Sequence, residues 1–160
     1  MSKYTNVKIV HIQYPDEIHR ALAVRRQVFV EEQGYSEEIE LDGQDDVCQH
    51  WIVTCDKENE DGSVEHNVDI GNVRLIPKPE GVAKLGRLAV LSSARGLQIG
   101  RLLVEAFVDY CKKNSFNTIV LHSQYPRRGF YEKTGFKIEH GDDKIFDEAG
   151  TPHVRMWMRL

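Results

Sequence analysis

The sequence predicts an α/β fold of the α+β type: a mixed, mostly antiparallel sheet with one parallel strand pair in its middle and flanking helices. Apolar residues recur at helical spacing from Ile99 to Cys111, which predicts a long amphipathic helix. The short run Thr118–Leu121 that follows is almost continuously apolar, as in a strand covered on both faces. A strand, a helix and a strand at this spacing form a right-handed crossover, so the two strands are expected to be parallel.

Length and composition fit one domain. The chain has 160 residues, so we expect a single domain over residues 1–160. Its formal charge of −4 gives no global attraction for nucleic acid. No apolar run reaches membrane-spanning length, and the N-terminal segment lacks the apolar core of a signal peptide. We therefore expect no membrane partner and a cytoplasmic location, extending to the nucleus in a eukaryote.

A strand and a helix are predicted at the start of the chain. The strand is Val7–Ile12, and Pro15-Asp16 opens a helix that runs to about Gln33. Continuing the apolar stripe of this helix places Arg25 on its inward face. A buried guanidinium keeps its proton, so Arg25 requires carboxylate or carbonyl partners.

The next segment, residues 34–47, is acidic and irregular. It carries the carboxylates of Glu37, Glu38, Glu40, Asp42, Asp45 and Asp46. The segment is either a solvated loop, or a source of carboxylates that pair with Arg25 or face a cationic substrate.

Two predicted strands, His50–Cys55 and Val68–Ile76, are joined by a polar loop in which Asp61-Gly62 is a strong turn signal. The strand that ends at Val90 changes phase at Gly86-Arg87. Such a slip fits either a β-bulge or a strand buried on both faces, and periodicity leaves the two equal.

The C-terminal part is predicted to hold a short helix that begins at Pro126 and ends at Gly135. Phe136–Glu139 and Val154–Met158 are then expected to form a closing strand pair. Three scattered cysteines lack metal-ligand spacing, so we expect reduced thiols and no metal site.

The segment before the long helix carries the clearest functional signal. Its glycine-bearing turn would expose backbone N–H groups at a helix start, where phosphates bind. The run Arg95-Gly96-Leu97-Gln98-Ile99-Gly100 resembles the acetyl-CoA signature Q/R-x-x-G-x-G/A of the GCN5-related N-acetyltransferases (GNAT). Gln98 replaces the first glycine of that signature. Residues 129–136, GFYEKTGF, resemble the F-Y-x-K-x-G-F segment of the same family.

The resemblance covers nearly the whole chain. Residues 24–33, VRRQVFVEEQ, followed by Glu40, Asp42, Asp45 and His50, are similar to the YjcF and ElaA types of bacterial acetyltransferase. Residues 147–153, DEAGTPH, resemble the YjcF type in particular. The family fold implied is a mixed sheet whose central parallel pair is splayed.

The resemblance also implies an activity and a cofactor site. The chain would be an acyltransferase that uses acetyl-CoA (CoA) to acetylate a primary amine of a small molecule by direct attack in a ternary complex. Backbone groups of Leu88, Ala89 and Val90 would pair with the pantetheine arm. The pyrophosphate would be held by Arg95, Gly96, Leu97, Gln98, Ile99, Gly100 and Arg101.

Tyr131 aligns with the tyrosine that protonates the CoA thiolate in many family members, and it would also contact the cofactor. The strand glutamate that often serves as base is missing, because Lys84, Gly86 and Arg87 occupy that region. Candidates for the base are Glu32, Asp42, His50, His122 and His153, among which His122 and His153 join Tyr131 in the predicted catalytic set.

The predicted acceptor-binding residues are Arg25, Glu32, Asp42 and His50. For Arg25 with Glu40 and Asp42, the alternative is a buried ion-pair network that fixes the first helix to its loop.

Two other functions stay open. The Gln98 departure and the missing strand glutamate are compatible with a CoA-binding sensor that has lost catalysis. A lesser alternative is an acyltransferase similar to acyl-homoserine lactone synthases, which share R-x-x-V-F and E-x-D-x-x-D. The oligomeric state is open between a monomer and a homodimer.

Overall fold

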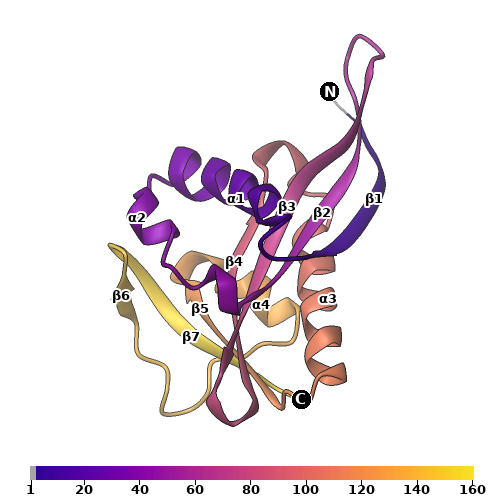
Figure 1. The fold of residues 1–160 in the computed structure, drawn as a ribbon. Coiled ribbons are helices and arrows are strands. Elements are labelled where there is room, and N and C mark those ends of the chain that lie inside the picture. Colours follow the sequence, from indigo (N-terminus) through magenta and orange to yellow (C-terminus); the bar gives the residue numbers. More distant parts are fainter. Residues whose placement is uncertain (1–2) are drawn as a thin grey trace.

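The computed structural model describes residues 3–160, which fold around one seven-stranded sheet of order β1-β2-β3-β4-β5-β7-β6 (Figure 1). The strands are β1 (Lys3–Ile12), β2 (Gln49–Glu58), β3 (Val64–Lys78), β4 (Val82–Val90), β5 (Thr118–Gln124), β6 (Phe146–Glu148) and β7 (Thr151–Arg159). Within residues 3–160, β4 and β5 are the only strands that pair in parallel, and they lie in the middle of the sheet. This confirms the predicted architecture.

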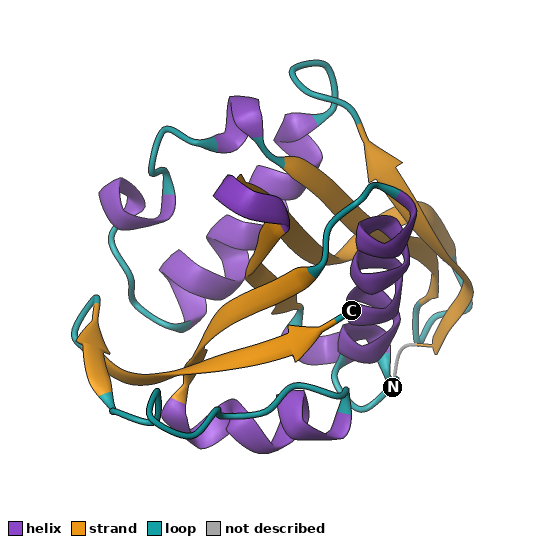
Figure 2. Cartoon of the chain, turned by 90° about the horizontal axis from the view of Figure 1, so that it is seen from below, coloured by secondary structure: helices purple, strands orange, loops and turns teal. Residues whose placement is uncertain are grey.

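Helices cover both faces of the sheet (Figures 1 and 2). They are α1 (Ile18–Arg25), a π-helix (Arg26–Glu32), α2 (Glu37–Glu40), α3 (Ile99–Lys113) and α4 (Arg128–Lys133), with short 3₁₀ turns at Asp45–Val47, Pro79–Gly81, Ser92–Ala94 and Tyr125–Arg127. Successive side chains of a strand point to opposite faces. Accordingly, Ile52 packs with α1, whereas its neighbours Trp51 and Val53 belong to the core beneath α3.

The first helix differs in detail from its prediction. It begins at Ile18 and changes at Arg26 from α-helical to π-helical hydrogen bonding. Periodicity at 3.6 residues per turn does not reveal such a change, because a π-helix adds one residue per turn only locally. The inward position predicted for Arg25 is confirmed, since its side chain is 0% exposed.

The phase slip in β4 is a bulge. Asn72 of β3 faces Ala89, and Arg74 faces Gly86, so one β3 residue between them opposes two β4 residues. Arg87, one of these two, has φ 51, in the left-handed region. The extra residue turns the strand and aims the Arg87 side chain toward the acidic loop.

The parallel pairing of β4 with β5 stops early. It runs from Val82 opposite Thr118 to Leu85 opposite Leu121. Both strands continue beyond this point, to Val90 and to Gln124, without pairing with each other. The two strands are therefore separated next to the start of α3.

The sequence predicted Phe136–Glu139 as the strand that pairs with Val154–Met158, and this prediction is wrong. Strand β7 pairs along its length with β5 and at its start with β6, whereas Phe136–Glu139 contributes only an isolated bridge between Lys137 and Trp157. Strands β6 and β7 are joined by Ala149 and Gly150, both with positive φ. A two-residue turn of this kind matches the twist of a hairpin, and its short loop costs little entropy to close.

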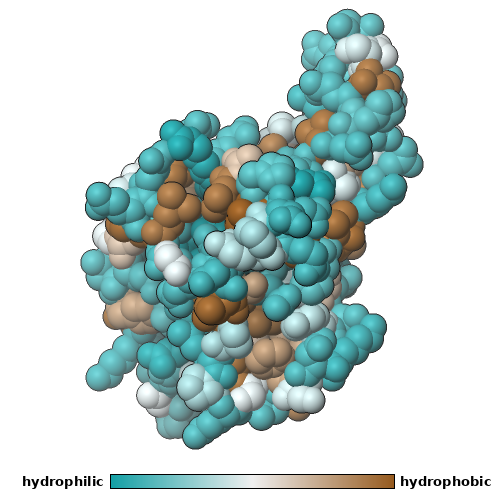
Figure 3. Space-filling model, viewed as in Figure 1, coloured by the Kyte–Doolittle hydropathy of each residue, from teal (hydrophilic) through white to brown (hydrophobic). Residues whose placement is uncertain are grey.

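The β2–β3 hairpin extends beyond the rest of the molecule and turns at residues 59–63 (Figures 1 and 3). Its surface is largely hydrophilic, with few apolar side chains (Figure 3). Within residues 3–160, no helix combines the length and apolar character needed to cross a membrane.

Candidate active site

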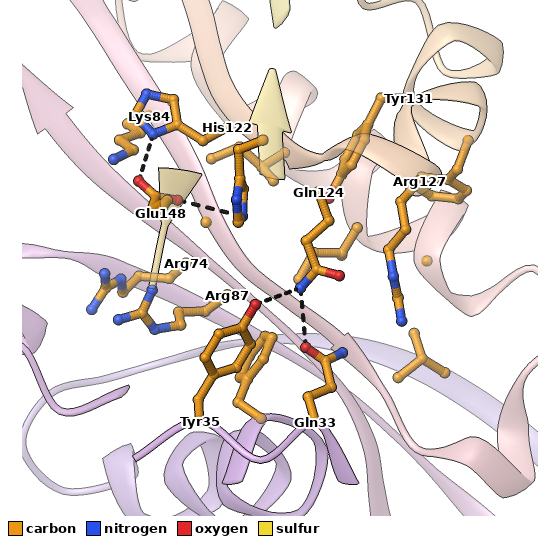
Figure 4. Close-up of a pocket in the computed structure, with 18 of the residues that line it drawn as sticks. Gln33, Tyr35, Arg74, Lys84, Arg87, His122, Gln124, Arg127, Tyr131 and Glu148 are labelled. Atoms are coloured by element: carbon orange, nitrogen blue, oxygen red, sulfur yellow. Dashed lines mark hydrogen bonds and ion pairs between the residues drawn. The ribbon is translucent and has the colours of Figure 1, made fainter. Parts of the chain in front are cut away.

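A cavity of about 940 Å³ opens where β4 and β5 separate. We call its two parts the helix half and the sheet half. The helix half is lined by the start of α3, by α4 and by the end of β4. The sheet half is lined by β3, β4 and β5 together with the acidic loop and the β6–β7 turn. Figure 4 shows side chains from both halves pointing into this space.

The helix half begins at Gln98, which precedes α3 with φ 65 and ψ 20. This is the left-handed conformation that a glycine adopts without strain, so the backbone keeps the shape of the signature although the residue is not glycine. No side chain caps the first N–H groups of α3. Together with the helix dipole, these groups offer donors and partial positive charge to an anion in the cavity.

Gly100, in the first turn of α3, packs closely against α4. A Cβ placed there would lie 3.1 Å from Cζ and 3.4 Å from Cε1 of the Phe130 ring. A side chain at this position would therefore require the Phe130 ring to shift by a few tenths of an ångström.

Arg95 is held at the rim by Glu32 and by a backbone carbonyl. Its Nη1 and Nη2 donate to the two carboxylate oxygens of Glu32 at 2.7 and 2.8 Å. Its Nε and Nη2 also donate to the Val90 carbonyl at 3.2 and 3.0 Å. Hydrogen bonding from Arg95 lowers the pKa of Glu32, so this carboxylate stays ionised at neutral pH.

Three further cations line the helix half. Arg101 donates to Glu105 at 3.1 Å, one turn further along α3. Arg127 and Lys133 line the cavity and make no hydrogen bond or ion pair with residues 3–160. Figure 4 shows the Arg127 guanidinium extended into the cavity. Arg127 and Lys133 are therefore free to meet phosphate oxygens, whereas Arg101 is paired with Glu105.

Tyr131 of α4 stands between the two halves (Figure 4). Burial raises its pKa to about 12, with Arg127 opposing the shift slightly. The phenol therefore carries its proton throughout the neutral range.

The sheet half holds a carboxylate between two histidines (Figure 4). His122 Nδ1 lies 2.8 Å from Glu148 Oε1, and His153 Nε2 lies 3.5 Å from Glu148 Oε2. Hydrogen bonding from His122 lowers the pKa of Glu148. An ionised carboxylate only accepts hydrogen bonds, so His122 Nδ1 is the donor, and in the neutral ring Nε2 keeps a free lone pair. His153 instead donates from Nδ1 to the Thr151 carbonyl at 2.8 Å.

A polar bridge crosses the cavity beside the strand separation (Figure 4). The Gln124 amide donates to Gln33 Oε1 at 3.1 Å and to the Tyr35 hydroxyl at 3.2 Å. The Tyr35 hydroxyl also lies 3.0 Å from Thr151 Oγ1. These contacts tie the end of the first helix to β5 and β7.

The acidic loop is fixed by arginines. Arg25 donates to the Glu40 carboxylate, to the Glu40 carbonyl at 3.1 Å and to Asp45 at 2.8 Å. Arg74 binds Asp42 in a bidentate pair at 2.9 and 2.7 Å and reaches Asp45 at 3.1 Å. The structure therefore contains the ion-pair network that the sequence left as an alternative. Burial alone would raise the pKa of Asp42, but the hydrogen bonds and charge of Arg74 lower it to about 2.

Most of the predicted site residues line the cavity. They are Leu88, Val90, Arg95, Gly96, Gln98, Ile99, Gly100, Arg101, Tyr131, Asp42, His122 and His153. Five others do not border it. Ala89 is buried against Val24 and Val28, and Leu97 is 47% exposed. Arg25 is buried in its network, Glu32 lies behind Arg95, and His50 is buried with Nε2 against the Asp45 carbonyl at 2.9 Å.

Sequence reasoning missed several lining residues. Glu148 lies within the DEAGTPH segment but received no role from the sequence, because only the β6–β7 hairpin brings it to His122. The Ala149-Gly150 dipeptide before a strand was a usable turn signal for that hairpin. Arg127 and Lys133 belong to the short helix that was predicted, and its position after the parallel strand places them at the cavity.

Nothing in residues 3–160 groups three or more metal-ligating side chains in a metal-binding arrangement. Cys48, Cys55 and Cys111 are free, buried thiols away from the cavity lining. Burial raises the pKa of Cys48 to about 11 and that of Cys111 to about 12. These thiols stay protonated and serve as packing groups.

Comparisons with known proteins agree with this geometry. The family model "Acetyltransferase (GNAT) family" matches residues 16–136. YyaT of Bacillus subtilis is 33% identical over 94% of both chains, and the B. subtilis N-acetyltransferase YjcF is 29% identical over 94% of this chain and 98% of its own. A protein of Lactobacillus plantarum assigned as an N-acetyltransferase is 30% identical, with a TM-score of 0.80 over 96% of this chain and 98% of the other. Escherichia coli ElaA, 21% identical over 98% and 99% of the two chains, shares the fold at a TM-score of 0.72.

The signature at α3, the splayed parallel pair and these matches lead to one assignment, which also confirms the resemblance to the YjcF type. The chain belongs to the GNAT family of acetyltransferases.

Proposed function

We propose that this chain is an acetyl-CoA-dependent N-acetyltransferase that acetylates a primary amine of a small molecule by direct attack within a ternary complex. The observation that carries the proposal is the separation of β4 from β5 after Leu85 and Leu121. Because the strands separate, one cavity reaches both the start of α3 and the His122–Glu148 pair. A donor bound at the first and an amine bound at the second would meet at Tyr131.

The residues of the helix half fit a coenzyme A. The uncapped start of α3 and the side chains of Arg101, Arg127 and Lys133 suit a pyrophosphate and a further phosphate. The β5-facing edge of β4 has no strand partner from Gly86 to Val90. The Val90 carbonyl accepts from Arg95, and the other backbone groups of this edge are left for the amides of a pantetheine arm. When bound, acetyl-CoA supplies the activated acetyl thioester.

The sheet half supplies the base. His122 Nε2 accepts the proton that the amine loses as its nitrogen forms the new bond to the acetyl carbon. Glu148 fixes the tautomer through Nδ1 and stabilises the imidazolium that results. An unpaired backbone N–H of residues 86–90 polarises the thioester carbonyl.

Tyr131 supplies the acid. Its phenol, with a pKa of about 12, donates to the sulfur as the carbon–sulfur bond breaks. The burial that raises the pKa of Tyr131 also disfavours an ionised thiolate beside it. The proton therefore passes between two groups whose pKa values are both raised.

The proposal is tested by ligand binding and by thiol release. Acetyl-CoA at one hundred times its Kd should raise the unfolding temperature by about 5–10 °C for a chain of this size. Release of free CoA thiol is then followed over a panel of primary amines. His122→Gln should keep the thermal shift and lose turnover by about a hundredfold or more. The exposed His140, away from the cavity, gives the matched control His140→Gln.

A protein that neither acetyl-CoA nor CoA stabilises would refute the cofactor assignment. Full turnover in His122→Gln would refute the assignment of the base.

A further inference from the structure

The sheet half of the cavity has more cationic than anionic groups free for a ligand. Arg74, Lys84 and Arg87 all project onto it from neighbouring strands (Figure 4). The acidic loop lies opposite, and its charges would favour a cationic acceptor if they were free. They are not free.

Each loop carboxylate that reaches this region is paired. Asp42 is held by both terminal nitrogens of Arg74, and Asp45 is shared between Arg25 and Arg74. The Glu40 carboxylate is paired with Arg25 and lies 3.4 Å from Arg87 Nε. Three guanidinium groups thus meet three carboxylates, and the network as a whole is neutral.

Arg87 belongs to this network, but one of its nitrogens, Nη1, has no contact with it. The Nη2 atom donates to the carbonyls of Ile39 and Glu40, both at 3.1 Å, and lies 3.4 Å from Asp42 Oδ2, which fixes the guanidinium in place. Its Nη1 makes no hydrogen bond with residues 3–160, and Arg87 borders the cavity. A guanidinium that is already positioned by backbone carbonyls loses little freedom when it binds an oxyanion through its free edge.

Lys84 is a cation that lies outside this network. It is half-buried on β4, borders the cavity and makes no hydrogen bond or ion pair within the described part of the chain. Burial lowers the pKa of Lys84, and the positive charges of Lys78, Arg87 and Arg74 add to this shift while Glu148 opposes it. Glu148 is itself hydrogen-bonded to His122, and His153 Nε2 lies 3.5 Å from its other oxygen. A bound anion would relieve the repulsion among these cations.

We infer that the acceptor is a primary amine that also carries an anionic group, a carboxylate or a phosphate ester, and that Lys84 and Arg87 bind this group. The inference rests on the proposed function, because it places the amine at His122. With the anion beside β4 and the amine beside β5, the acceptor spans the separated strands. Its two ends are then recognised by groups of different character, a pair of cations at one end and a histidine next to a carboxylate at the other.

The test measures binding separately from turnover. Isothermal titration compares ω-amino carboxylates and aminoalkyl phosphates with diamines and alkylamines of the same chain lengths, on the wild type, Lys84→Gln and Lys112→Gln. Lys112 is an exposed lysine in the last turn of α3, away from the cavity. Lys84 was chosen because a change of Arg87 would disturb the network that holds the loop.

The wild type should prefer the anionic amines, and Lys84→Gln should reduce that preference by at least about tenfold while Lys112→Gln preserves it. The tighter of the two anionic series identifies the group. Lys84→Glu should shift the preference to diamines.

Equal or tighter binding of diamines by the wild type would overturn the inference. So would a preference that survives in Lys84→Gln, or no binding of any anionic amine. Thiol release from acetyl-CoA is scored independently. Its absence refutes the proposed function, whereas Lys84-dependent binding of an anionic amine still supports the anion site.

Discussion

Replacement of Gln98 by glycine should stabilise the protein and strengthen acetyl-CoA binding. Gln98 holds φ 65 immediately before α3. A side chain in the left-handed region costs about 1–2 kcal/mol, and glycine removes that cost while adding about 0.5–1 kcal/mol of backbone entropy to the unfolded chain. The net expectation for Gln98→Gly is a gain of about 0.5–1 kcal/mol in the free energy of unfolding.

Urea unfolding measures this gain as a higher midpoint at an unchanged m-value. Ser115 is the matched control, because it has the same φ of 65 and lies outside the cavity lining. Ser115→Gly should give a similar gain in stability and leave acetyl-CoA binding unchanged. Gln98→Gly should in addition lower the Kd, because the backbone N–H groups at the start of α3 become more accessible to the pyrophosphate.

Weaker acetyl-CoA binding in Gln98→Gly would refute this reasoning, because it would mean that the glutamine side chain contacts the cofactor directly. Gln98→Ala distinguishes the two roles. It keeps a Cβ in the left-handed region and removes the amide, so it should bind acetyl-CoA like the wild type if the backbone alone forms the site.

Three further predictions concern single contacts. Tyr131→Phe should lower kcat by about a hundredfold with the acetyl-CoA Kd nearly unchanged; an unchanged kcat would mean that water donates the proton. Because the pKa of Tyr131 is about 12, the rate of the wild type should show no alkaline loss from this group up to about pH 10. Glu32→Gln should release Arg95 for the phosphates and lower the acetyl-CoA Kd by up to about fivefold at low salt, measured by titration calorimetry. Weaker binding would instead show that Glu32 holds Arg95 in its binding position. Asp42→Asn should cost about 2 kcal/mol of stability at neutral pH, because the pKa of Asp42 falls from 3.8 to about 2 on folding. That contribution is present above about pH 4 and disappears as the pH falls through about 2, so urea midpoints of wild type and variant should converge in acid; a constant difference would place the stability elsewhere.

The parts of the fold that follow local rules could be predicted. Helix α3 was evident because its apolar stripe continues over several turns, and the inward position of Arg25 followed from the stripe of the first helix. The parallel pair followed from the chirality of the crossover. In each case, a repeating pattern along the sequence corresponds to a repeating geometry in the structure.

The contacts between distant segments could not be predicted in the same way. The pairing of Glu148 with His122 depends on which strand lies beside β7. The sequence predicted Phe136–Glu139 in that position, where the structure has β6. The change to π-helix at Arg26 leaves no periodic signal of its own. The acidic loop looked like a solvated or substrate-facing segment, because the arginine that neutralises Asp42 comes from β3, far along the chain.

Three residues at the cavity, Arg87, Gln98 and Ala149, adopt positive φ without being glycine. Each of the three sets the position of a group at the cavity. The bulge at Arg87 directs its guanidinium to the loop, and Gln98 starts α3 at the cavity. Ala149 turns the chain so that Glu148 meets His122. Such strain persists only where surrounding contacts hold it, and at Arg87 the carbonyls of Ile39 and Glu40 do so. Because Asn6, Asn67, Glu80 and Ser115 also adopt positive φ and lie outside the cavity lining, a positive φ does not by itself mark the site. What distinguishes the three residues at the cavity is that each determines where a group of the site points.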